Sequence, residues 1–266
     1  MRLAISHRQG VQFVSAVLLS VLAGCGSVVD RTLEETFEQV YTMEPTANVT
    51  ITNSDGAVFV YGSNLNELRV EAIKKAYTRQ RLKQIGVNVS VQRDAISINT
   101  KLPLKPKWAL FDHSGTVDYT VVLPATANLT RLALDNGEVL LDGMRGQIVK
   151  ARLGTGRMFA HNCFGNVVLA VGRGTLTLAY EWWEAGKFSM RANIARGSVW
   201  AFLPSNAAFH LIAETGDGNI ANDFETSAAR RTKEITKVDM LVRGGGQAGL
   251  TMHAREGNIK IVEANP

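Results

Sequence analysis

The sequence predicts an all-β protein built as a β-solenoid, in which short strands stack along one axis. A glycine followed by a short β-rich run recurs from Gly137 onward, and the first five glycines of this series are 9, 10, 9 and 9 residues apart. Such spacing leaves room for one short strand and one turn in each unit. Pairs of units recur every 18 to 21 residues, as from Gly137 to Gly156 and from Gly197 to Gly218. Units repeated at this period can stack with aligned strands and share one apolar core.

Glycine has a steric role at these bends. A chain that turns sharply between strands needs a residue with positive φ, which glycine adopts without steric cost. We therefore expect positive φ at the structural turns of Gly137, Gly156 and Gly218. Dipeptides such as Asn136–Gly137 and Asp217–Gly218 are also strong hairpin signals. The alternative architecture is therefore an antiparallel meander folded into a sandwich.

Composition excludes several classes of protein. The 266 residues are 45% apolar and 20% charged, which is enough for one or two packed domains and unlike a disordered chain. Two cysteines cannot supply a disulfide framework. A formal charge of +5 is too small to indicate a nucleic-acid-binding protein. We therefore expect no nucleic acid among the partners.

The first 24 residues have the pattern of an export signal. Arg2 and Arg8 form a basic leader, residues 11–22 are mostly apolar, and Leu-Ala-Gly-Cys follows at 22–25. This arrangement resembles the lipobox of bacterial lipoproteins, so residues 1–24 are predicted to be a lipoprotein signal peptide. The resemblance implies that the Cys25 thiol receives a diacylglycerol and that the chain is cut just before it. The apolar run is shorter than the roughly 20 residues that a membrane-spanning helix needs.

Lipidation would attach the mature chain to a membrane. Each buried methylene contributes about 0.8 kcal/mol, so two or three acyl chains hold a protein on a bilayer without a spanning helix. Gly26 stands where many bacteria place the aspartate that retains a lipoprotein in the inner membrane. The expected location is therefore outside the cytoplasm, on the cell envelope, and the outer membrane is favoured in a bacterium that has one.

After the lipobox, residues 25–44 are expected to be a tether and residues 45–266 a single β-repeat domain. Residues 78–84 are the most helix-like segment near the start of this domain. Alternating or β-rich runs predict strands ahead of the glycine series at 49–51, 57–62, 68–73, 87–91 and 96–98.

Three segments resemble the bacterial putative adhesin family. Residues 117–124 and 197–204 both end in Leu-Pro, and residues 213–220 end in Gly-Asp-Gly-Asn-Ile. With the glycine units, the resemblance covers residues 45–265. It implies a right-handed β-helix that is exported or membrane-linked and carries no established catalytic residues. The adhesin-like binding or scaffold role that it also implies rests on analogy.

The candidate ligand-binding residues are Glu181, Trp182, Trp183 and Glu184. Neighbouring residues of a strand point to opposite faces, so at least one indole is expected at the surface unless a loop covers it. An exposed tryptophan can stack on a sugar ring while the flanking carboxylates accept hydrogen bonds from its hydroxyl groups. Packing of both indoles into the core is the competing interpretation.

A second aromatic loop contains Trp108, Phe111, Asp112 and His113. Both interpretations of the tryptophan pair, ligand contact and core packing, apply to it as well.

The sequence contains no convincing pattern for catalysis, a metal or a cofactor. His161 and Cys163 are two residues apart, but two ligands alone do not indicate a metal site. Cys163 is expected to be a buried structural thiol. Residues 244–249 have the spacing of a dinucleotide-binding loop, but no helix follows them to receive the phosphates. We therefore expect a non-enzymatic protein with no metal and no cofactor.

These observations predict a lipid-anchored envelope protein that binds a surface polymer or an envelope protein. The alternative is a polysaccharide-active enzyme, either a lyase or a hydrolase, because parallel β-helices also carry such enzymes. Three or more acidic or basic side chains from successive coils, meeting in one groove, would favour the enzyme.

Replacement of Cys25 tests the anchor. Because Cys25 is the only acceptor in the lipobox, Cys25→Ser is expected to abolish labelling with radioactive fatty acid and to move the protein out of the membrane fraction. Cys163→Ser leaves the lipobox intact and is the control. Unchanged labelling of the Cys25→Ser protein would overturn the prediction.

Overall fold

The computed structural model describes residues 32–103, 115–225 and 236–264. They form one helix, α1 (Arg79–Gln84), as expected for residues 78–84; the hydroxyl of Thr78 caps it by accepting a hydrogen bond from the amide of Arg81. None of the described helical structure is long and apolar enough to cross a membrane.

The all-β class is confirmed, with these strands: β1 (Leu33–Thr42), β2 (Asn48–Ser63), β3 (Glu67–Ala76), β4 (Gly86–Val91), β5 (Ala95–Lys101), β6 (Thr116–Pro124), β7 (Asn128–Asp142), β8 (Val149–His161), β9 (Asn166–Ala179), β10 (Ser189–Pro204), β11 (Phe209–Asp217), β12 (Ile220–Asn222), β13 (Lys237–Val242), β14 (Gly249–Glu256) and β15 (Ile259–Ala264).

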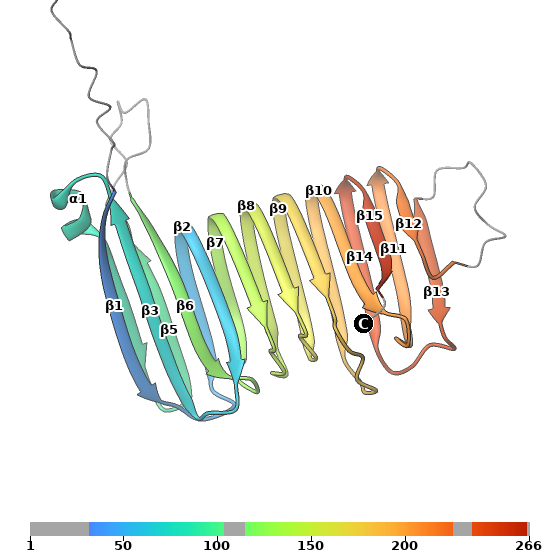
Figure 1. The fold of residues 1–266 in the computed structure, drawn as a ribbon, viewed down its shortest axis with the longest axis horizontal. Coiled ribbons are helices and arrows are strands. Elements are labelled where there is room, and N and C mark those ends of the chain that lie inside the picture. The colour runs from blue at the N-terminus through green and yellow to red at the C-terminus, as the bar shows by residue number, and fades with distance from the viewer. Residues whose placement is uncertain (1–31, 104–114, 226–235, 265–266) are drawn as a thin grey trace, which may run out of the picture. The chain divides into compact units, whose positions relative to one another are not determined.

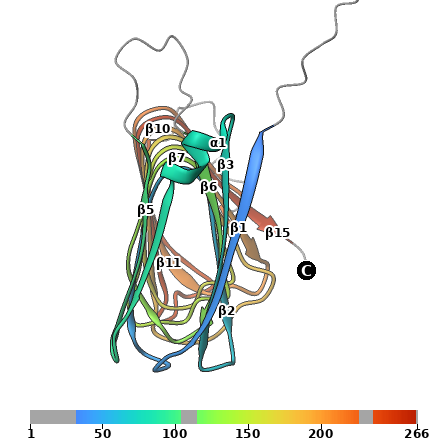
Figure 2. The same cartoon turned by 90° about the vertical axis from the view of Figure 1, so that its left-hand side faces the viewer.

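The fifteen strands form one mixed sheet. Its central part is parallel, with β2, β7, β8, β9 and β10 as successive neighbours (Figure 1). Antiparallel strands flank this part: β3 pairs with β6 and β1 with β3, while β13 pairs with β11. Each central strand is bent, so its first and second halves lie in two facing layers (Figure 2).

The bends coincide with glycines that lie opposite one another in neighbouring strands. The pairing register places Gly137 between Gly56 and Gly156, and Gly174 between Gly156 and Gly197. We call this row, with its extension toward the last strands, the glycine ladder. Its members all have φ between +127° and +150°: Gly56, Gly137, Gly156, Gly174, Gly197, Gly257 and Gly218.

Only glycine fits this ladder, for two reasons. A positive φ of this size is strained for residues with a side chain. In addition, a Cβ atom at Gly156 would lie 1.8 Å from the carbonyl oxygen of Gly137, and one at Gly137 would lie 1.7 Å from that of Gly56. The turn interpretation expected each of these glycines to separate two strands. Gly137 and Gly156 instead bend a continuous strand, whereas Gly218 does lie between two strands, β11 and β12.

Aligned rows of apolar side chains fill the space between the two layers. Leu134, Leu153, Val171 and Ile194 form one such row, and all are buried. The buried Asn53 donates a hydrogen bond of 2.8 Å to the carbonyl oxygen of Val117. No buried side-chain nitrogen or oxygen in the described part of the chain lacks a hydrogen-bond partner.

The last strands do not follow the spatial order of the chain. β14 pairs in parallel with both β10 and β11, and β15 pairs in parallel with both β10 and β12. The C-terminal segment therefore lies between two strands that precede it in the sequence.

The tether expected at 25–44 is wrong for residues 33–42. They form β1, which pairs antiparallel with β3 over its whole length. Phe37 and Tyr41 pack against the core, and Glu35 forms an ion pair with Lys74. Contacts made by the other strand of the pair thus order a segment whose own sequence has no clear strand period.

Gly156→Ala tests the glycine ladder. Positive φ and the neighbouring backbone oxygen are expected to lower the free energy of unfolding by more than about 1 kcal/mol, measured by urea denaturation. Gly186→Ala is the matched control, because a Cβ atom there would meet nothing within 4 Å. Equal stability of the two variants would contradict this account of the bend.

Candidate functional site

The second halves of the central strands carry aromatic side chains on their outer face. Phe159 on β8 and Trp200 on β10 lie on either side of Thr177 on β9 in the pairing register. Two residues further along each strand, on the same face, Ala179 lies between His161 and Phe202. Large rings therefore project from β8 and β10, while β9 between them carries small side chains.

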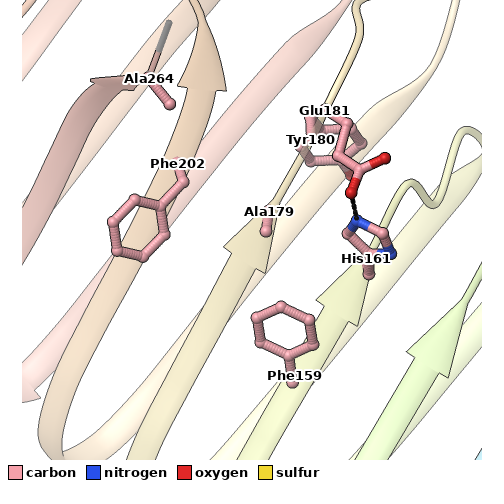
Figure 3. Close-up of a pocket in the computed structure, with 7 residues that line it drawn as sticks. All are labelled: Phe159, His161, Ala179, Tyr180, Glu181, Phe202 and Ala264. Carbon is pink, nitrogen blue, oxygen red and sulfur yellow. Dashed lines mark ion pairs between the residues drawn. The ribbon is translucent and has the colours of Figure 1, made fainter. Parts of the chain in front are cut away.

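This alternation creates a hollow of about 540 Å³, which we call the aromatic hollow (Figure 3). Figure 3 shows Ala179 between Phe202 on one side and the Phe159 and His161 rings on the other. Residues from β8, β9, β10, β15 and the segment after β9 line it: Phe159, His161, Ala179, Tyr180, Glu181, Phe202 and Ala264.

The polar rim of the hollow is a row of three ionisable side chains. Nδ1 of His161 is 2.9 Å from a carboxylate oxygen of Asp142 on β7, and its Nε2 is 3.4 Å from a carboxylate oxygen of Glu181. The side-chain nitrogen of Asn162 is 3.1 Å from Nε2 of His161. The side-chain oxygen of Asn162 accepts a hydrogen bond from the backbone amide of Glu181. Glu181 is the most open member, with a side chain 69% exposed.

Trp182 and Glu184 belong to a second cluster beside the hollow. Arg145 forms two hydrogen bonds to the Glu184 carboxylate, of 2.7 and 2.6 Å, and Nε1 of Trp182 donates a third, of 3.1 Å. The guanidinium group of Arg145 lies over the Phe164 ring, 5.2 Å from its centroid. Hydrogen bonding from Arg145 lowers the pKa of Glu184, which therefore stays ionised and engaged.

The two tryptophans have different environments. Trp182 is 45% exposed and contacts Phe164, with ring centroids 6.0 Å apart. Trp183 packs against the core, and its ring centroid is 5.3 Å from that of Phe188 and 5.5 Å from that of Phe209. One indole thus lies at the surface and the other in an aromatic cluster.

Cys163 is a buried thiol, as its expected structural role requires. Burial raises its pKa to about 12, so it is protonated and unreactive near neutral pH. It lies just beyond β8 and does not share an outward face with His161, because Asn162 between them has a φ of +48°. The described residues contain no group of three or more histidine, cysteine, aspartate or glutamate side chains placed to hold a metal ion.

The structure separates the four candidate residues of the sequence analysis. Glu181 lines the aromatic hollow, Trp182 lies exposed beside it, Trp183 packs inward, and Glu184 is held by Arg145. The loop that contains Trp108, Phe111, Asp112 and His113 lies outside the described residues.

Sequence reasoning missed the residues that form the walls of the hollow. Phe159 follows the ladder glycine Gly156 by three residues, and Phe202 follows the ladder glycine Gly197 by five. An odd offset from a ladder glycine is the signal that could have identified both as outward residues. Ala264 had no comparable signal, because β15 reaches the hollow only through its insertion beside β10.

Comparison with known proteins supports the fold. No family model matches the chain, and no curated protein matches it in sequence. The structure is similar to that of a putative cell adhesion protein from Clostridium sporogenes, with 14% identity, a TM-score of 0.50, and coverage of 86% of this chain and 100% of that one. At this identity the likeness extends to the fold alone.

Two further solved structures align over the same share of this chain. A putative adhesin from Bacteroides fragilis has 10% identity, 97% coverage of its own chain and a TM-score of 0.28. A putative lipid binding protein from Parabacteroides distasonis has 10% identity, 97% coverage and a TM-score of 0.32. These scores are too low to bear on the fold or the site.

The contrast between the two indoles can be measured. Trp183→Ala is expected to lower the free energy of unfolding by about 3 kcal/mol, because it leaves a cavity in an aromatic cluster. Trp182→Ala, the matched surface variant, is expected to lower it by about 1 kcal/mol or less. Urea denaturation measures the stability of both variants. A larger loss for Trp182→Ala than for Trp183→Ala would contradict the placement of Trp182 at the surface and Trp183 in the aromatic cluster.

Proposed function

We propose that this protein is a non-enzymatic, lipid-anchored component of the cell envelope that binds a surface glycan in the aromatic hollow. The observation that carries the proposal is the diagonal placement of two outward phenyl rings, Phe159 on β8 and Phe202 on β10, around Ala179 on β9, with ionisable side chains at one rim. The adhesin-like role expected from the sequence is consistent with this type of binding.

A sugar ring suits this arrangement of side chains. Neighbouring strands are about 4.8 Å apart, so β8 and β10 are separated by about 10 Å and leave room for one ring-sized group between their side chains. Phe159 and Phe202 offer apolar surfaces for the C–H face of a sugar. Glu181 and His161 offer hydrogen-bonding groups for hydroxyls at its edge.

The proposal includes the solenoid and the anchor. The parallel register of β2, β7, β8, β9 and β10, bent at the same glycine position, supports a right-handed β-solenoid with one coil for each strand. The lipobox at 22–25 supports lipidation at Cys25 and attachment to the outer membrane. Such an anchor would hold the hollow at a membrane surface, where envelope glycans are concentrated.

A polysaccharide-active enzyme is the second candidate, because Asp142 on β7, His161 on β8 and Glu181 in the segment after β9 form one row. One feature favours binding instead. Glu181 is largely exposed, whereas a carboxyl group that acts as a general acid is usually set up by burial.

The Phe159→Ala variant tests the hollow. Binding of the full chain, purified in detergent, is measured on an array of neutral and acidic bacterial oligosaccharides. Loss of one stacking ring is expected to weaken binding about tenfold or more without changing the melting temperature. Phe59→Ala is the matched control, because Phe59 is an outward phenylalanine on β2 that does not line the hollow.

Equal loss of binding in the two variants, or wild-type binding by Phe159→Ala, would contradict the proposal. Shortened oligosaccharides after incubation with wild-type protein, but not with Glu181→Gln, would instead support the enzyme.

A further inference from the structure

The outer face of the first strand halves has a different chemistry from the aromatic face. On the neighbouring strands β7, β8, β9, β10 and β14, five Lys and Arg side chains alternate outward, against one carboxylate on the same strands, Asp135 on β7. Glu214 also points outward, on the next strand, β11. The five cations are Arg131 on β7, Lys150 and Arg152 on β8, Arg191 on β10 and Arg255 on β14. On the aromatic face, Arg157 and Lys260 are accompanied by Glu138 and Asp142, so the net positive charge is confined to the first halves.

Most of these cations have no acidic partner. Arg131, Lys150, Arg152 and Arg191 form no ion pair within the described ranges, although other surface arginines such as Arg145 do. Arg255 is 3.6 Å from a carboxylate oxygen of Glu256. Like charges gathered on a rigid sheet repel one another, and a bound polyanion would relieve that repulsion.

Four of the five cations border two adjoining hollows whose floors consist mostly of small residues, and Arg191 lines neither. One hollow, of about 340 Å³, is lined by Arg131, Lys150 and Arg152. The other, of about 380 Å³, is lined by Arg152, His253 and Arg255. Ala170 is common to both, and the other outward, uncharged residues that line them are Thr130, Ala133, Gly154, Val168, Gly172, Asn193 and Ala195.

We call these joined hollows the basic trough. It crosses the strands from β7 through β8, β9 and β10 to β14, which is four strand spacings or about 19 Å. Its direction is therefore that of the strand stack, with cations at intervals along it.

We propose that the basic trough binds a linear anionic polysaccharide, with the polymer chain lying across the strands. An extended chain can reach a floor of alanine and glycine, whereas a bilayer or a nucleic-acid duplex is too broad to enter. Single-stranded nucleic acid is bound on platforms of large aromatic side chains, and the outward residues of these strand halves in the described part of the chain include no phenylalanine, tyrosine or tryptophan. Carboxylate or sulfate groups on the polymer would pair with Arg131, Lys150, Arg152 and Arg255.

The basic trough is independent of the aromatic hollow, because it lies on the first halves of the strands and recognises the negative charge of its ligand. Its test uses the full chain purified in detergent and polygalacturonate as the probe. The Lys150→Gln/Arg152→Gln double variant is expected to bind polygalacturonate about tenfold more weakly, because two charge-assisted contacts are lost. Binding by the wild-type protein is expected to weaken as salt is added.

The matched control is Arg157→Gln/Lys260→Gln, which removes the same charge from the aromatic face. It is expected to retain wild-type binding, which separates a local site from an effect of net charge. Fully methyl-esterified polygalacturonate has the same sugar without the charge and is expected not to compete.

Four results would overturn the proposal: wild-type affinity of the Lys150→Gln/Arg152→Gln protein, an equal loss in the control variant, competition by the esterified polymer as strong as that by polygalacturonate, or stronger competition by duplex DNA. Melting temperatures of both double variants verify that they fold.

Discussion

At each bend of the parallel strands, two neighbouring backbones lie too close for a side chain to fit between them. The carbonyl oxygen of Gly137 occupies the place that a Cβ atom of Gly156 would need, and the same contact recurs along the glycine ladder. Because the ladder aligns the bends, each strand enters both layers at the same register position. That alignment determines which side chains point inward, so the rows of the core and both outer faces depend on it.

Side chains alternate between inward and outward positions on both sides of each bend. The two halves of one strand therefore carry two different outer surfaces. On β8, Lys150 and Arg152 project from the first half, while Phe159 and His161 project from the second. β9 carries small outward residues in both halves, Ala170 and Ala179, and thus supplies the floor of the basic trough and of the aromatic hollow. The small side chains of β9 therefore contribute to both concave surfaces.

The inserted C-terminal strands complete both sites. β14 brings Arg255 to the basic trough, and β15 brings Ala264 to the aromatic hollow, because the two strands lie beside the two halves of β10. Without this insertion, the backbone edge of β10 would be unpaired along both of its halves. An unpaired strand edge can pair with other chains. The two inserted strands therefore cover the edge of β10 and also supply residues to both binding surfaces.

The sequence by itself was sufficient for the all-β class, for α1 and for the positive φ of Gly137, Gly156 and Gly218, because these depend on local chemistry and on a short repeat. It also predicted that at least one indole of the tryptophan pair lies at the surface, as Trp182 does. Tertiary structure alone decided that residues 33–42 pair as a strand, that Trp183 packs inward, and that β14 and β15 lie between β10 and the preceding β11 and β12. These outcomes depend on partners distant in the sequence, and neither a local period nor a residue's own preference specifies which partner will lie beside it.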